Sequence, residues 1–349
     1  MPDSFNSDAK TGMAHHTTSN ELLTEIVLVR PRGFCAGVER AIEIVERALE
    51  LYGAPVYVKH AIVHNHHVVQ RLEGMGAVFV EDLDEVPRDA RVIFSAHGVP
   101  PSAHTAAEDR QLKVLDATCP LVTKVHLEAQ RFARENRSIF LIGHHDHVEV
   151  IGTKGEAPDH TVVIGTVEEA SQVEVADPEQ VAYLTQTTLS LDDTRSIVDT
   201  LKARFPRLTG PGKEDICYAT QNRQNAVSAL VNEVDAILVV GSSNSSNSNR
   251  LVETARARGK RACLVDSFDD LDPGWLAGAK RIGVTAGASA PESIVQELVR
   301  RLAEPSGARI REIEVVEERV TFPLPAQLTP PTNPTAPGAT SPHPGKESV

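Results

Sequence analysis

Short apolar runs alternate with amphipathic helical patterns along most of this chain. The apolar runs are rich in Val, Ile and Leu, which favour strands, and most of the longer segments between them repeat apolar residues at helical spacing. The predicted strands cover residues 24–30, 55–58, 77–80, 91–95, 138–142, 161–165, 181–185, 235–240, 261–265 and 281–285. The predicted helices cover residues 36–51, 121–135, 191–204, 221–233, 248–258 and 291–303.

The order of these elements indicates an α/β protein with mainly parallel sheets, because strands joined through helices pair in parallel. The pattern occurs three times at comparable length, which predicts three quasi-repeated α/β domains over residues 23–119, 120–213 and 214–320. The first strand and the Cys35 loop are candidates for packing with the third domain. Residues 1–22 are interpreted as a disordered leader and the proline-rich residues 321–349 as a disordered tail.

Three cysteines stand at matching points of three segments, where an apolar run gives way to a helical pattern. Cys35, Cys119 and Cys217 are separated by 119 − 35 = 84 and 217 − 119 = 98 residues, about one small α/β module each. An odd number of thiols suggests a metal site with one position left open for chemistry. Spacing alone leaves the metal unknown, and the fourth cysteine, Cys263, fits an ordinary small core residue.

Composition narrows the classes of function. The chain of 349 residues has 35 basic and 48 acidic residues, a net charge of −13, which argues against a general nucleic-acid or membrane-surface role. No apolar run is long enough to cross a bilayer. Four cysteines make no disulfide framework, so a reducing cytoplasm is the expected compartment, where thiols serve metals or catalysis.

Histidines gather in three post-strand segments. These segments contain His60, His64, His66, His67, His97, His144, His145 and His147. Neutral imidazoles suit zinc, but the chain has no HExxH helix motif, and histidines in such turns are also donors for an anion. Both interpretations stay open at this point.

Loops rich in hydroxyl and amide side chains follow other predicted strands. VVGSSNSSNSNRL contains Ser245, Ser246, Asn247 and Asn249, GVTAGASAPESI contains Ser289, and YLTQTTLS contains Thr187 and Thr188. One such loop would be a helix cap, but three favour a small phosphorylated substrate held by backbone N–H groups and neutral donors. No GxGxxG follows the first strand, so nicotinamide binding is not expected.

Taken together, these strings closely resemble the 4-hydroxy-3-methylbut-2-enyl diphosphate reductase family, the LytB/IspH proteins. The matching strings are GFCAGV, VHN, SAHGV, DATCP, GHxxHxEVxGT, TQTTLS, DICYAT, GSxNSSNSNRL and TAGASAP. They span roughly residues 24–320, and jointly they are highly specific.

The resemblance implies reductive removal of a hydroxyl from (E)-4-hydroxy-3-methylbut-2-enyl diphosphate, giving isopentenyl and dimethylallyl diphosphate in the last step of the non-mevalonate isoprenoid pathway. It implies three α/β domains around a central [4Fe–4S] cluster. Cys35, Cys119 and Cys217 would bind three irons, leaving the fourth iron open to the substrate hydroxyl. The partners implied are the diphosphate substrate and an external one-electron donor of the ferredoxin or flavodoxin type, with no nucleic acid and no membrane.

The resemblance also implies roles for the polar residues. The residues expected to bind the diphosphate are His64, His97, Thr188, Ser245, Ser246, Asn247 and Ser289. Glu149 is the expected proton donor, Thr187 orients the substrate hydroxyl, and His147 lies near the substrate and the proton donor. The chain departs from the family pattern at Val148, where proline is usual, and at Ile151, where a polar residue is common.

Two other functions remain compatible with parts of the sequence. The histidine clusters are compatible with a zinc-dependent hydrolase of a small phosphorylated substrate. The cysteines alone are compatible with a non-catalytic iron–sulfur redox sensor, although a sensor needs no loops for a diphosphate.

Overall fold

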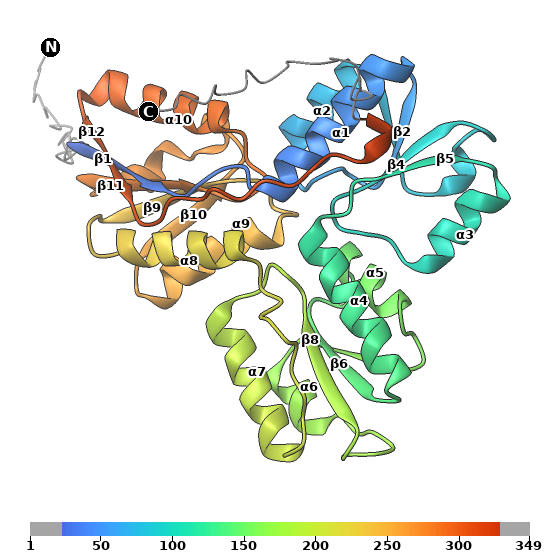
Figure 1. Ribbon diagram of the computed structural model, residues 1–349. Coiled ribbons are helices and arrows are strands. Elements are labelled where there is room, and N and C mark those ends of the chain that lie inside the picture. The colour runs from blue at the N-terminus through green and yellow to red at the C-terminus, as the bar shows by residue number, and fades with distance from the viewer. Residues whose placement is uncertain (1–22, 329–349) are drawn as a thin grey trace, which may run out of the picture.

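Three parallel β-sheets form the framework of the protein. The computed structural model describes residues 23–328 and shows three lobes that meet at the centre of the molecule (Figure 1). The first sheet has the order β3 (Ala77–Val80), β2 (Val56–Lys59), β4 (Arg91–Phe94), β5 (Lys113–Asp116). The second has the order β7 (Thr161–Ile164), β6 (Ser138–Ile142), β8 (Val181–Thr185). The third has the order β10 (Arg261–Val265), β9 (Ala236–Val240), β11 (Arg281–Ala286), β1 (Glu25–Arg30), β12 (Arg309–Glu314).

Helices connect successive strands in all three lobes. They are α1 (Ala36–Tyr52), α2 (His66–Gly74), α3 (Pro101–Asp109), α4 (Pro120–Arg134), α5 (Val148–Gly155), α6 (Val167–Gln172), α7 (Leu191–Arg204), α8 (Tyr218–Leu230), α9 (Ser246–Ala257) and α10 (Glu292–Ser306). Every strand pair within the three sheets is parallel, which confirms the predicted fold class.

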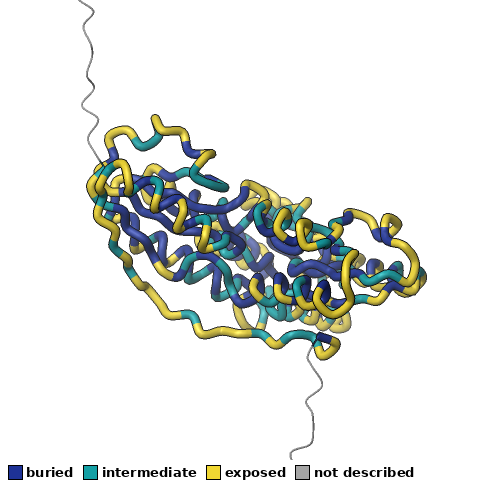
Figure 2. Tube along the Cα trace, turned by 90° about the horizontal axis from the view of Figure 1, so that it is seen from above, coloured by how far each residue is buried: buried dark blue, intermediate teal, exposed yellow. Residues whose placement is uncertain are grey.

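Each sheet is covered on both faces, which explains the continuous apolar runs of its strands. Side chains alternate between the two faces of a strand, so Ile26 and Leu28 of β1 pack in one core cluster while Val27 and Val29 pack in another. In β6, Phe140 likewise packs in a different cluster from its neighbour Leu141. Figure 2 shows the buried positions inside the molecule and the exposed ones along its outer helices and loops.

The first strand and the first helix belong to different lobes. β1 lies between β11 and β12 of the third sheet, whereas Ala41, Ile44 and Val45 of α1 pack in the core of the first sheet. The chain therefore crosses between two lobes immediately around Cys35. This crossing places Cys35 at the interface of the first and third lobes.

Some elements differ from the predictions. No strand precedes Cys217 directly, because the segment GPGKEDIC offers too few consecutive apolar residues; the chain forms only an isolated bridge from Thr209 to Ala182. The strand β12 was not predicted, since its sequence RIREIE lies at a sheet edge and buries none of its residues fully. The helix α8 begins three residues before its predicted start, because Cys217 itself is its N-cap.

The expectation that the disordered tail begins at residue 321 is wrong for residues 323–328. The chain after β12 runs across to α1 (Figure 1), where the Pro323 carbonyl accepts a hydrogen bond from Arg40 and the Gln327 carbonyl accepts one from Tyr52. Leu328 is only 2% exposed and belongs to the core cluster around α1. The remaining predicted tail, 329–349, and the predicted leader, 1–22, lie outside the described residues.

The replacement Leu328→Ala is expected to lower the free energy of unfolding by about 2–4 kcal/mol, since it removes a buried side chain and leaves a cavity. Chemical denaturation monitored by circular dichroism would measure the change. Val320→Ala, at a side chain 41% exposed in the preceding segment, is the matched control and should change stability by about 0.5 kcal/mol or less. Equal stability of the two variants would show that the docked segment contributes nothing.

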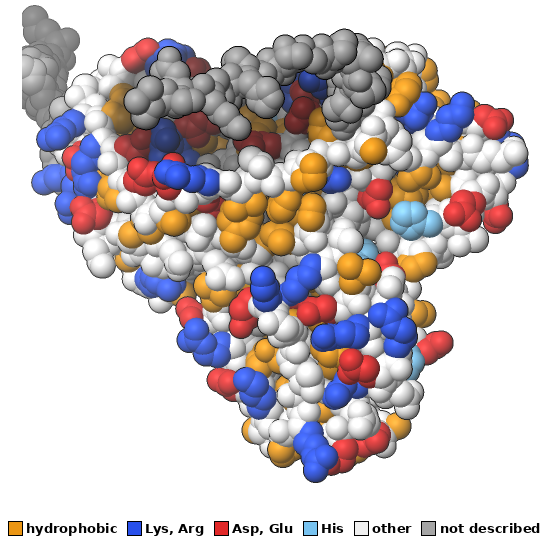
Figure 3. Space-filling view, in the orientation of Figure 1, with side chains coloured by type: hydrophobic (Ala, Val, Ile, Leu, Met, Phe, Trp, Pro, Cys, Tyr) orange, Lys and Arg blue, Asp and Glu red, His pale blue; other side chains and the backbone are white. Residues whose placement is uncertain are grey.

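The outer surface carries both signs of charge. On the face in Figure 3, Lys and Arg side chains are interspersed with Asp and Glu over the three lobes. None of the helices within residues 23–328 combines the length and the apolar character that a membrane-spanning helix needs.

Candidate functional site

All the residues to which the resemblance assigns a role line one cavity at the centre of the three lobes, whereas His60, His66, His67, His144, His145 and Asn249 are not part of its wall. The cavity has a volume of about 100 Å³. The predicted residues in its wall are Cys35, His64, His97, Cys119, His147, Glu149, Thr187, Thr188, Cys217, Ser245, Ser246, Asn247 and Ser289. Residues that are far apart in the sequence and come from all three lobes therefore meet at one place, although their individual roles stay predictions.

The parallel sheets explain this convergence. Most of these residues follow the carboxyl end of a strand, and in open parallel sheets ligands bind beyond those ends. Several of them are also the N-cap residues of the helices that begin there. These N-caps are Cys35 of α1, Cys119 of α4, His147 of α5, Cys217 of α8 and Ser245 of α9. The cavity is thus surrounded by helix N-termini, whose positive ends favour anions.

The three thiols fit a cluster of several metal ions. Within the described residues, no three His, Cys, Asp or Glu side chains are placed to hold a single metal ion, so the thiols surround the cavity instead of meeting at a point. That arrangement suits an iron–sulfur cluster, in which each thiolate binds a different iron. Burial raises the pKa of Cys119 to about 12 and that of Cys217 to about 11. Both thiols are therefore neutral until a metal replaces the proton.

Gly37 leaves room for the sulfur atoms. A Cβ atom added to Gly37 would lie 2.7 Å from the Cys119 Sγ and 3.8 Å from the Cys35 Sγ. The first of these distances is far too short for a carbon and a sulfur atom, so a side chain at this position would displace a thiol. The glycine of the GFCAGV string therefore serves close packing against two of the three cysteines.

Gly37→Ala is expected to lower the iron bound per chain although it removes no ligand, because the new methyl group occupies the space of the Cys119 sulfur. Iron and acid-labile sulfide analysis of protein purified without oxygen would measure the loss. Gly74→Ala, in a helix where a Cβ meets nothing within 4 Å, is the control. Full iron content in Gly37→Ala would show that iron still binds when the methyl group displaces the Cys119 sulfur.

Glu149 is a buried carboxyl group held by one neighbour. Its side chain is on the first turn of α5, and the residue is 3% exposed. The backbone N–H of Thr187 donates to Oε1 over 2.6 Å, and the Thr187 hydroxyl donates to Oε2 over 3.0 Å. Burial raises the pKa of Glu149 and outweighs these two hydrogen bonds, which lower it. A raised pKa suits a group that delivers a proton near neutral pH.

The three cavity histidines are held in the neutral form. The rings of His64 and His97 stack with their centroids 4.0 Å apart, and the His147 ring meets that of His64 edge-on at 5.2 Å. Burial lowers the pKa of His64 to about 4 and that of His147 to about 3, and it lowers the pKa of His97 well below its usual value. Each ring therefore presents one N–H donor.

Unpartnered ring nitrogens mark a place for a ligand. The Glu149 backbone N–H donates to His147 Nδ1, so the proton of this neutral ring is on Nε2. Within residues 23–328, His147 Nε2 and both ring nitrogens of His64 are buried and have no hydrogen-bond partner. Since buried polar atoms are nearly always paired, these atoms indicate a polar ligand in the cavity.

Hydrogen bonds join the serine- and asparagine-rich segment at the start of α9 to the loop after β11. The Ser245 hydroxyl accepts from the Ser248 backbone N–H and caps α9, while the side-chain Oδ1 of Asn247 accepts from the Ala288 backbone N–H over 2.9 Å. The Ser289 hydroxyl donates to the His64 carbonyl over 2.9 Å, which ties this loop to the first lobe. The hydroxyl and amide groups are therefore held in fixed positions around the cavity.

Thr220 also lines the cavity, although no sequence pattern predicted a role for it. Its backbone N–H donates to the Cys217 Sγ over 3.4 Å, and its hydroxyl accepts from the Asn247 amide over 3.2 Å. It thus links Cys217 to Asn247. The DICYAT string contained Thr220, but nothing in the sequence alone indicated these contacts.

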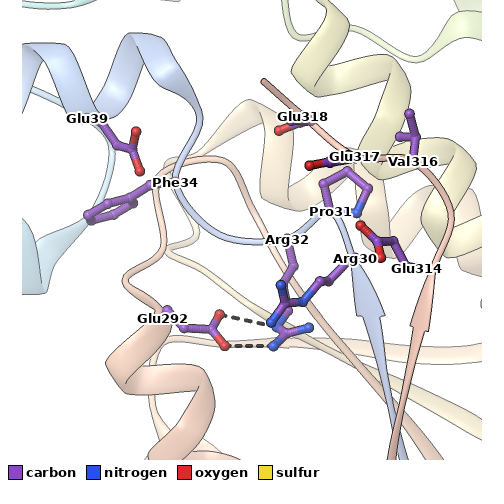
Figure 4. A pocket seen from close by; sticks show the side chains of 10 residues that line it. All are labelled: Arg30, Pro31, Arg32, Phe34, Glu39, Glu292, Glu314, Val316, Glu317 and Glu318. Atoms are coloured by element: carbon purple, nitrogen blue, oxygen red, sulfur yellow. Dashed lines mark hydrogen bonds and ion pairs between the residues drawn. The ribbon is translucent and has the colours of Figure 1, made fainter. Parts of the chain in front are cut away.

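A larger cavity of about 520 Å³ lies elsewhere and does not fit an anionic ligand (Figure 4). It is lined by Arg30 and Arg32 and by more carboxylates than guanidinium groups. These carboxylates belong to Glu39, Glu292, Glu314, Glu317 and Glu318. Arg32 is paired with Glu292 at 2.7 Å, so the net charge of the wall repels a diphosphate.

Comparison with known proteins shows the family of this chain. The model of the LytB protein family matches residues 26–303, which covers most of the chain. The chain belongs to the LytB protein family. This LytB chain is 57% identical over 307 residues, 88% of its length and 98% of the relative, to a 4-hydroxy-3-methylbut-2-enyl diphosphate reductase of Aromatoleum aromaticum. It is 54% identical over 318 residues, 91% of its length and 96% of the relative, to the reductase of the same name from Mycolicibacterium paratuberculosis.

A solved structure agrees with the architecture of this LytB chain. The E-1-hydroxy-2-methyl-but-2-enyl-4-diphosphate reductase of Plasmodium falciparum is 42% identical, with a TM-score of 0.85 over 88% of this chain and 97% of that one. The two proteins therefore share the three-lobed fold over most of both chains.

Proposed function

We propose that this chain reduces (E)-4-hydroxy-3-methylbut-2-enyl diphosphate to isopentenyl and dimethylallyl diphosphate, the terminal step of the non-mevalonate pathway. The observation that carries the proposal is the convergence of three thiols, three neutral histidines, a buried carboxyl group and the hydroxyl loops on one cavity. Relatives that are more than half identical over nearly their whole length are named as this reductase.

Cys35, Cys119 and Cys217 would hold a [4Fe–4S] cluster, one per chain. When bound, such a cluster supplies single electrons and an iron without a protein ligand that can accept the substrate oxygen. The three thiols come from three different strand–helix or loop–helix junctions, so the lobes must be assembled before all three ligands are in place.

The diphosphate would lie among the imidazole, hydroxyl and amide groups that line the cavity. These groups are His64, His97, Thr188, Ser245, Ser246, Asn247 and Ser289. The negative charge of a bound diphosphate favours the protonated imidazoles, so binding would raise the low pKa values of His64 and His97. The helix N-terminus of α9 adds its partial positive charge.

Glu149 would deliver the proton that lets the substrate hydroxyl leave as water. Thr187 touches both oxygens of the carboxyl group and would orient the hydroxyl beside it. His147 fixes the start of α5 through its Nδ1 and faces the cavity with its Nε2 proton. Val148 is the first residue of this helix, where the family usually has proline, and Glu149 makes both of its contacts with Thr187.

The same chemistry supports a proposal for the electron donor and for the compartment. A reductase with a one-electron centre needs an external one-electron donor, for which we propose a protein of the ferredoxin or flavodoxin type. All four cysteines are free thiols, which suits a reducing cytoplasm.

Anaerobic turnover of the allylic diphosphate with a chemically reduced viologen dye tests the function. Dye oxidation coupled to formation of both five-carbon diphosphates is expected. Iron with acid-labile sulfide in the purified protein separates the reductase from a zinc-dependent hydrolase, which would contain stoichiometric zinc. A protein with a full iron–sulfur content that never oxidises the dye would support a redox sensor instead.

A further inference from the structure

The central cavity contains no full positive charge. Neither Lys nor Arg is among the described residues that line it, and its histidines are neutral because burial lowers their pKa values. The whole chain has a net charge of −13, so its overall field repels an anion. A cation beside the cavity would therefore favour the approach of a diphosphate against this field.

A second cavity lies directly beside the central one. It has a volume of about 260 Å³ and shares two lining residues, His147 and Ser246, with the central cavity. Its outer wall includes the exposed Asn244, from the loop after β9, and Glu253 on α9. This second cavity, called the mouth below, thus lies between the second and third lobes and borders the central cavity at His147 and Ser246.

Arg250 is the cation of this mouth. It belongs to α9, and its side chain is 18% exposed. Its Nη2 donates to His144 Nε2 over 2.5 Å, from the loop after β6, so the neutral His144 ring has its proton on Nδ1. Its Nη1 lies 3.5 Å from Asp193 and also contacts Glu253.

These two carboxylates would compete only weakly with a diphosphate for the guanidinium group of Arg250. The side chains of Asp193 and Glu253 are 70% and 51% exposed, and exposed ion pairs contribute little free energy. A diphosphate has more charge than either carboxylate and matches the planar donor pattern of Arg. It can therefore replace one of them without a large loss.

We propose that Arg250 captures the diphosphate of the incoming substrate at this mouth and passes it to His147 and Ser246, which border both cavities. Arg250 is thus a positioning residue that acts before the chemical step. The inference rests on the proposed function, because it assumes a diphosphate substrate.

The variant Arg250→Gln tests the capture step. We expect kcat/KM at low ionic strength to fall by about tenfold, as expected for loss of electrostatic steering, while kcat stays within about twofold. The loss should shrink at 0.5 M salt, where charges are screened to about 4 Å. The inhibition constant of inorganic pyrophosphate should rise by the same factor as KM, and Arg250→Lys should restore most of kcat/KM.

Arg258→Gln is the matched control, since it removes the same charge from the far end of α9, about 12 Å along the helix, beside Asp192. Arg258→Gln should have the kcat/KM and the salt dependence of the wild-type protein. The proposal is overturned if Arg250→Gln matches Arg258→Gln, or if its loss falls on kcat and does not change with salt. Wild-type protein that fails to turn over the substrate would instead refute the proposed function.

Discussion

Replacement of Cys35, Cys119 or Cys217 by serine is expected to abolish turnover and to lower the iron and acid-labile sulfide bound per chain. Each thiol lines the central cavity, and each is supplied by a different junction of the fold, so no other cysteine can take its place. A serine hydroxyl stays protonated near neutral pH and is a poor ligand for iron. Metal analysis and the visible absorption of protein purified without oxygen would measure the loss.

Cys263→Ser is the matched control for these variants. Cys263 lies on β10, packs against the core of the third sheet and is absent from the cavity wall. This variant should keep its cluster and its activity. A serine variant at any of the three cavity positions with a full and stable four-iron content would refute the ligand assignment.

Replacement of Glu149 by glutamine is expected to lower kcat by about 10²–10³-fold, within the usual contribution of a general acid, and to change KM by less than about fivefold. Glutamine keeps the size of the side chain and an oxygen that can accept the Thr187 backbone hydrogen bond. It cannot deliver a proton. Steady-state kinetics with the reduced dye would separate the effects on kcat and KM.

The pH dependence of kcat gives an independent test of the same role. A general acid must be protonated, and burial raises the pKa of Glu149, so wild-type kcat should fall as pH rises through that raised pKa. Glu149→Gln should lack this decline. Glu169→Gln, at an exposed carboxylate on α6 that contacts His145, is the control and should behave like wild type. A Glu149→Gln variant with wild-type kcat would exclude the proton-donor role.

The alternation of apolar runs and helical patterns was sufficient to predict the architecture, because the sheets are parallel and buried. Strands such as β1 and β6 are covered on both faces, so each contains an uninterrupted run of four apolar residues that stands out from its surroundings. The edge strand β12 lacks that signal, since it lies beside β1 at the rim with its side chains largely in solvent. The docking of residues 323–328 was missed for a similar reason: a proline-rich segment with one buried leucine has no periodicity to reveal.

The sequence by itself determined the kinds of chemical groups in the site and, through the matching motifs, the family. It placed the cysteines, histidines and hydroxyl loops at element junctions, and the fold brought them together because carboxyl ends of parallel strands share one edge. Only the tertiary structure decided what surrounds each group. Burial at the meeting point of three lobes sets the pKa values of Glu149 and His147, and contacts over long sequence distances hold Thr187 against Glu149 and open a mouth beside Arg250.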